Sequence, residues 1–135
     1  MGYQDAGHEE TAPKATTLII SKLASPLLGT TQAIKIMPGS HAYKAYGQQT
    51  VMEQFSCRYG FNPLFRDKID GGELQTTGVG PDEEIRIVEL SNHRFYVATL
   101  FLPQMSSSAD RPHPLIVEYL RAALDFRSSS RNGVA

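Results

Sequence analysis

Cysteine and histidine are the side chains that most often carry nucleophilic or metal chemistry, and this chain has one cysteine and four histidines. Cys57 lies in a strand-like segment, and the sequence positions no histidine beside it to lower the pKa of its thiol. The pattern therefore favours a buried structural thiol over a nucleophile. The histidines are too scattered for the spacing of a metal site, and they stand at His8, His41, His93 and His113. We predict no metal and no cofactor.

A second place for chemistry is the end of an apolar strand. Residues 85–90 and 95–101 form two apolar runs joined by 91–94, a pattern that predicts two strands. The second run is apolar at nearly every residue, which is typical of a strand covered on both faces. It ends at Leu102-Pro103-Gln104. The ends of buried strands are where α/β proteins tend to place their sites.

Arg58 and Tyr59 end another strand-like segment, residues 51–59. A guanidinium group can bind both oxygens of a carboxylate, so these two residues are a candidate site for a small carboxylate ligand. The alternative is an exposed strand arginine that binds nothing.

The segment Phe-Tyr-Val-Ala-Thr-Leu-Phe-Leu-Pro-Gln (95–104), followed by Arg-Pro-His-Pro-Leu (111–115), resembles the end of a class I glutamine amidotransferase domain. It is most like the kind fused to CTP synthase, whose strand ends in Gln-Phe-His-Pro-Glu. In that family the His and Glu belong to a Cys-His-Glu triad that hydrolyses glutamine. The resemblance places Leu102 and Gln104 at these two positions. A leucine cannot accept a proton and an amide cannot stabilise an imidazolium as a carboxylate does, so the resemblance implies a broken triad and no catalytic residue.

The resemblance extends from Gly2 to about Phe126 but covers only the back half of the family's domain. It implies an α/β, partial class I glutamine amidotransferase-like (flavodoxin-like) three-layer fold, a mixed sheet with a β-hairpin and a C-terminal helix. The front half, with the first parallel strands and the catalytic cysteine, is expected to be absent. Arg58 and Tyr59 match a family segment, Arg-Tyr-Glu-Phe-Asn, whose arginine helps to hold glutamine. Gly60 departs from that segment, since it replaces the glutamate.

The remaining pattern predicts alternating strands and short helices. Strands are expected at 17–23, 31–36, 51–59 and 73–79, with 25–29 breaking the first from the second. Helices are expected at 40–46, 64–69 and 113–126, the last with its apolar residues on one face. We predict one domain over 1–126 and a disordered tail over 127–135.

Composition excludes several classes of partner. The net charge is −1, with 13 basic and 14 acidic residues, which gives no electrostatic basis for binding nucleic acid or an anionic membrane. No apolar run reaches the length of a membrane span. A single cysteine suits a reducing compartment, so a cytoplasmic location is expected.

Two functions follow as hypotheses. The first is a non-catalytic module that binds a small carboxylate ligand such as glutamine or acts as an interaction domain. The second is one half of a glutamine amidotransferase or related hydrolase, whose nucleophile comes from another polypeptide or a missing N-terminal segment. A half-domain would leave a sheet edge and apolar surface uncovered, which predicts a homodimer or association with the missing half. A further alternative is a piece of a longer product, with Met1 an internal or misassigned start.

Overall fold

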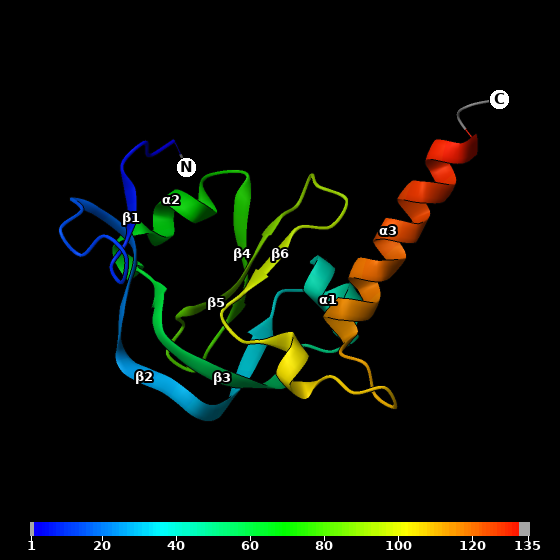
Figure 1. Ribbon diagram of the computed structural model, residues 1–135, viewed down its shortest axis with the longest axis horizontal. Helices are drawn as coiled ribbons and strands as arrows, with labels where there is room; N and C mark the ends of the chain where they lie inside the picture. The colour runs from blue at the N-terminus through cyan, green and yellow to red at the C-terminus, as the bar shows by residue number, and fades with distance from the viewer. Residues whose placement is uncertain (1, 133–135) are drawn as a thin grey trace.

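The computed structural model describes residues 2–132 and shows a mixed sheet with several short helices and one long C-terminal helix (Figure 1). The strands follow the order β1-β2-β4-β5-β6, and β3 pairs with β2 off this path. Among the strand pairs of the described residues, β1–β2 is parallel and the others are antiparallel. The elements are β1 (Ala6–His8), β2 (Thr17–Ile36), α1 (His41–Tyr46), β3 (Thr50–Phe61), η1 (Pro63–Phe65), α2 (Arg66–Asp70), β4 (Leu74–Val79), β5 (Ile85–Leu90), β6 (Val97–Thr99), η2 (Pro103–Ser106) and α3 (Pro114–Asn132).

The first two predicted strands are one long, curved strand, so the predicted break at 25–29 is wrong. The β2–β3 register shifts between Lys22 and Leu27, and Pro26 lies in this gap where no partner needs its missing N–H. A second shift between Leu28 and Thr30 contains Gly29, whose φ of +61° suits a bulge. Bulges bend the strand without ending it, and β2 and β3 curve together along the lower edge of Figure 1.

The core lies between this curved pair, β5 and the two helices α1 and α3. Phe55 and Phe101 pack edge to face with ring centroids 5.9 Å apart, and both side chains are fully buried. The predicted helix at 40–46 is confirmed. Ser40 Oγ accepts the Tyr43 N–H at 3.0 Å, and Gly47 ends the helix with a φ of 69°.

The strand predicted at 95–101 is much shorter than expected. β6 has three residues, and within residues 2–132 it pairs only with β5, so its other edge has no partner strand. Tyr96 is 46% exposed, and Ala98 is also exposed. The prediction of a strand covered on both faces is therefore wrong for the described chain. An apolar sequence indicates that a strand is buried in the functional protein. It does not show that the same chain provides the residues that bury it.

The predicted disordered tail is also wrong over residues 127–132, because α3 continues to Asn132. Once a helix is nucleated, each further residue adds one hydrogen bond. Residues 115–132 contain no Gly or Pro that would end the helix. Ser129 Oγ and Ser130 Oγ each donate to the carbonyl oxygen four residues earlier. Residues 133–135 of the predicted tail lie outside the described residues. The last turns of α3 extend away from the rest of the chain (Figure 1).

Within residues 2–132, no helix combines the length and apolar character needed to cross a membrane.

Candidate functional site

The strand end to which the resemblance points carries no group that transfers a proton. The chain leaves β6 through Phe101, which is 1% exposed, and reaches Leu102, which is 38% exposed. Gln104 follows in η2 and is exposed. An aliphatic side chain and an amide thus follow this strand, and neither can accept a proton or stabilise a protonated base as a carboxylate does.

His113 is held away from this role by a buried network. Its Nδ1 accepts the Leu115 N–H at 3.2 Å, so its ring proton lies on Nε2, which donates to Glu53 Oε1 at 2.9 Å. Tyr46 OH donates to the same oxygen at 2.5 Å. His113 and Glu53 are each 4% exposed. The network joins α1, β3 and the start of α3, and both ring nitrogens of His113 are already used.

Burial, followed by the hydrogen bond and the charge of Glu53, raises the pKa of Tyr46 well above its ordinary value. The folded chain therefore keeps this phenol protonated where the unfolded chain loses its proton, above about pH 10. The stability that this group contributes is fully present below about pH 10 and decreases as the pH rises further. We expect the free energy of unfolding of the wild type to fall by up to about 1.4 kcal/mol more per pH unit than that of Tyr46→Phe.

Chemical denaturation of both proteins between about pH 9 and 11 measures this difference. The other tyrosines are common to both proteins and cancel in the comparison. Equal pH slopes would contradict the buried Tyr46–Glu53 contact.

His93 is also absent from the strand end. It stands in the turn between β5 and β6, whereas Leu102 follows the far end of β6. Its Nδ1 accepts the Phe95 N–H at 3.3 Å, and its backbone oxygen lies 3.2 Å from His41 Nε2. Neither His93 nor His113 is therefore available as a base at the strand end.

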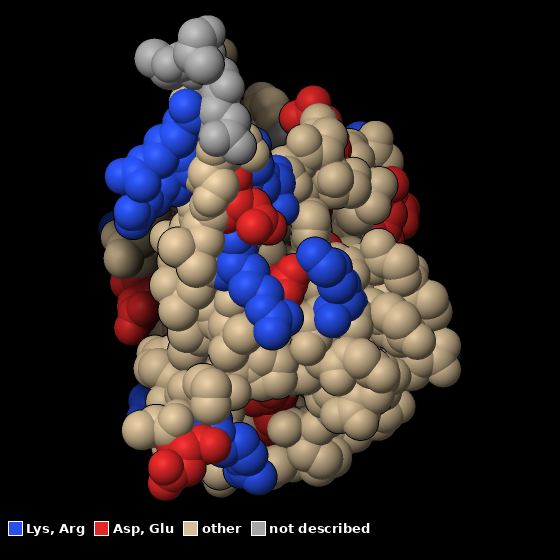
Figure 2. Space-filling view, turned by 90° about the vertical axis from the view of Figure 1, so that its right-hand side faces the viewer, with Lys and Arg blue, Asp and Glu red and all other residues tan. Residues whose placement is uncertain are grey.

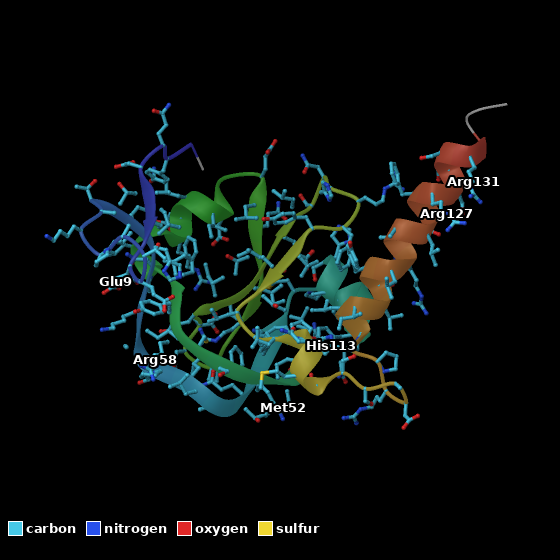
Figure 3. The ribbon with its side chains drawn as sticks, viewed as in Figure 1. Glu9, Met52, Arg58, His113, Arg127 and Arg131 are labelled. Carbon is cyan, nitrogen blue, oxygen red and sulfur yellow. The ribbon has the colours of Figure 1, made fainter. Side chains whose placement is uncertain are left out.

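The predicted ligand residues lie elsewhere in the fold. Arg58 and Tyr59 line an open cavity of about 370 Å³ together with His8 and Cys57, and neither Leu102 nor Gln104 contributes to it. Arg58 is exposed at the outer side of the β2–β3 ribbon, well separated from His113 (Figure 3). Within the described residues Arg58 forms no ion pair. The structure thus leaves its guanidinium open to a ligand but does not bring it to the strand end.

Cys57 is partly buried and packs against the core. Burial raises the pKa of its thiol, and the charge of Arg86 lowers it to a smaller extent. A raised pKa keeps the thiol protonated near neutral pH, where only the thiolate is a strong nucleophile. This agrees with the structural role predicted from the sequence.

A second buried carboxylate, which the sequence patterns did not indicate, holds the start of α1. Glu89 is 2% exposed; its Oε2 accepts the His41 N–H at 2.8 Å and its Oε1 accepts the Ala42 N–H at 2.9 Å. Thr77 Oγ1 donates to Oε1 at 2.9 Å. Glu53 and Glu89 share a signal that could have found them, since each is a charged residue at an inward position of a strand.

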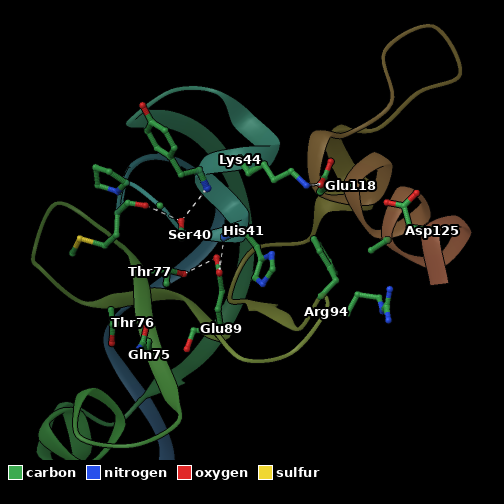
Figure 4. Close-up of a pocket in the computed structure, with 17 residues that line it drawn as sticks. Ser40, His41, Lys44, Gln75, Thr76, Thr77, Glu89, Arg94, Glu118 and Asp125 are labelled. Atoms are coloured by element: carbon green, nitrogen blue, oxygen red, sulfur yellow. Dashed lines mark hydrogen bonds and ion pairs between the residues drawn. The ribbon is translucent and has the colours of Figure 1, made fainter. Parts of the chain in front are cut away.

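Beside α1 lies a cavity of about 570 Å³ between the sheet and α3 (Figure 4). The loop before α1, β4, the end of β5 and the β5–β6 turn form its walls with α3. Charged side chains of both signs line it: Lys44, Glu89, Arg94, Glu118 and Asp125. The sequence did not predict this cavity, because its residues come from four separate segments of the chain, 37–44, 75–77, 89–95 and 118–125.

No protein-family model matches the chain. It is 35% identical over 133 residues to the CTP synthase of Carboxydothermus hydrogenoformans, a match that covers 91% of this chain and 25% of that protein. It is 40% identical over 90 residues to the CTP synthase of Roseiflexus sp., covering 66% of this chain and 16% of the relative. The chain spans about a quarter of the length of the curated relatives that it matches first.

Solved structures show the same fold. The glutaminase domain of Trypanosoma brucei CTP synthase, with bound acivicin, superposes with a TM-score of 0.84 at 23% identity, over 92% of this chain and 52% of that one. A GMP synthase-like protein of Thermoplasma acidophilum superposes with a TM-score of 0.61 at 10% identity, over 83% and 51% of the two chains. The prediction of an α/β, partial class I glutamine amidotransferase-like fold is confirmed.

Proposed function

We propose that this chain, a homologue of the C-terminal half of the class I glutamine amidotransferase domain of CTP synthases, is a non-catalytic module of that domain type. The observation that carries the proposal is the strand end at Leu102 and Gln104, where the family has two members of its triad. Both ring nitrogens of His113 are hydrogen-bonded within the protein, and the pKa of the Cys57 thiol is raised. These observations support the proposal, because they leave neither side chain suited to act as the base or the nucleophile.

The module is proposed to bind a small carboxylate such as glutamine at Arg58. Support comes from an open cavity around an exposed guanidinium and from Tyr59 beside it. The ring of Tyr59 packs on that of His8 with centroids 5.1 Å apart, which gives the cavity one aromatic wall. The arginine fork suits the two oxygens of a carboxylate.

A glutaminase assay on the purified chain tests the proposal. We expect no ammonia release above the rate without protein, with a CTP synthase as the positive control, and calorimetric binding of glutamine that Arg58→Ala abolishes. Release that survives Cys57→Ser would place an active site elsewhere, and release abolished by that change would make Cys57 a nucleophile. Either result would contradict the proposal that the module is non-catalytic. Binding unchanged in Arg58→Ala would remove the carboxylate site.

The second candidate function is half of a glutamine amidotransferase. The comparisons favour it in one respect, since the matched region is about half of a glutaminase domain. Another polypeptide or a preceding segment would then supply the nucleophile. Mixing the chain with a polypeptide that carries the front half of such a domain distinguishes the two functions, because ammonia release in the mixture requires a base that Leu102 cannot provide.

We expect the chain to self-associate, as the partner in a homodimer can cover apolar surface that one copy leaves open. The free edge of β6 and exposed apolar side chains nearby support this expectation; the large ones include Tyr96, Leu102 and Met105. Sedimentation analysis should give twice the mass of one chain. A well-folded, monodisperse monomer would contradict the dimer. A cytoplasmic location remains a prediction.

A further inference from the structure

The cavity beside α1 carries a charge pattern that the proposed function does not use. It is separate from the Arg58 cavity, since the two share no lining residue. Its volume of about 570 Å³ falls in the range of sites for small molecules, roughly 300–1,000 Å³. Some of the charged side chains that line it already form hydrogen bonds or ion pairs within the protein, and others form no ion pair among the described residues.

The charges nearest to α1 are satisfied. Glu89 takes the first two N–H groups of the helix, so the end of α1 that would attract an anion is already occupied. Lys44 Nζ lies 2.5 Å from Glu118 Oε1, and Arg121 Nη1 lies 3.4 Å from Glu118 Oε2. A ligand gains little from these groups without first breaking their contacts.

Arg94 and Asp125 are different. Among the described residues neither takes part in an ion pair, although both line the same cavity. The Arg94 guanidinium lies over the Phe126 ring, 4.8 Å from its centroid, which holds it in place without neutralising it. Figure 4 shows both side chains on the side of the cavity away from Glu89, with the His41 imidazole between Glu89 and Arg94 in that view.

An unpaired cation and an unpaired anion in one cavity suit a ligand that carries both charges. A plain anion would face Asp125, and a plain cation would face Arg94. Across the centre of the face that includes α3, basic and acidic side chains lie close to one another, and a group of basic side chains gathers at the upper left of the view (Figure 2). We infer that this cavity binds a free α-amino acid or a zwitterion of similar size, with the carboxylate on Arg94 and the ammonium group on Asp125.

Isothermal titration calorimetry with L-serine, L-alanine, L-leucine and L-phenylalanine tests the inference. At least one should bind with a Kd of about 1 mM or tighter. Removing one charge from the ligand, as its N-acetyl derivative or its methyl ester, should weaken binding about tenfold or more, because each end makes a charge-assisted contact. Arg94→Gln and Asp125→Asn should each weaken binding of the intact amino acid to a similar extent.

The matched controls are Arg127→Gln on α3, which also carries Asp125, and Asp110→Asn in the loop before α3. Both residues are exposed and lie outside the cavity. They should bind as the wild type does. If none of the four amino acids binds, or if Arg94→Gln and Asp125→Asn leave binding unchanged, the inference is wrong. An N-acetyl derivative that binds as tightly as the amino acid would also overturn it. Binding lost only in Arg58→Ala would overturn it while supporting the carboxylate site of the proposed function.

Discussion

Replacing Glu53 by alanine is expected to lower the free energy of unfolding by about 2–5 kcal/mol, because two buried donors lose their acceptor at a cost of about 1–3 kcal/mol each and the two costs are not fully additive. Within the described residues, Glu53 is the only carboxylate that accepts the Nε2–H of His113, and it also accepts the Tyr46 hydroxyl. The variant leaves both donors buried without this acceptor and opens a space in β3. Because the three residues come from different elements, α1 and α3 should both loosen against the sheet. Urea denaturation followed by circular dichroism measures the change.

The control is Glu73→Ala, which removes the same side chain from an exposed position and should change stability by less than about 0.5 kcal/mol. Glu53→Gln keeps one acceptor oxygen and should fall between the two. If Glu53→Ala were as stable as the control, the network would contribute nothing measurable. The proposal that His113 is unavailable for chemistry would then lose its main support.

Much of the fold could be predicted because local sequence determines it. α1 begins at the expected cap and ends at Gly47, and β3 follows its alternating pattern. The failures concern long-range structure. The break expected at Pro26 is a bulge because β3 continues alongside, and β6 is short because the described chain places no strand on its far side. Neither fact is encoded in the residues of the segment itself.

For the candidate site too, residue types could be predicted from the sequence, whereas long-range contacts could not. The resemblance predicted that Leu102 and Gln104 stand at two triad positions, and their residue types alone show that they cannot transfer a proton wherever the fold places them. It could not show that His113 is locked by Glu53, or that Arg58 lies in a different cavity from the strand end. Arg94 and Asp125 are 31 residues apart and carry no motif, so only the fold brings them to one cavity.

Glu89→Ala should produce a loss of similar size, about 3–5 kcal/mol, by a different route. Two backbone N–H groups and the Thr77 hydroxyl would lose their acceptor at a site where Glu89 is 2% exposed. Each buried donor left unsatisfied costs about 1–3 kcal/mol, and the three are not fully additive. α1 has six residues and is too short to be stable alone, so its first turn depends on this carboxylate.

Hydrogen exchange separates this effect from a general loss of stability. In Glu89→Ala the amides of His41 and Ala42 should exchange faster than the β3 core, whereas Thr77→Val removes one donor with its need for an acceptor and should cost only about 1 kcal/mol. Uniform acceleration across the whole chain would mean that Glu89 acts through global stability alone. Faster exchange confined to α1 would instead identify Glu89 as the group that shapes the wall of the cavity, and that variant should then also bind the amino-acid probes more weakly.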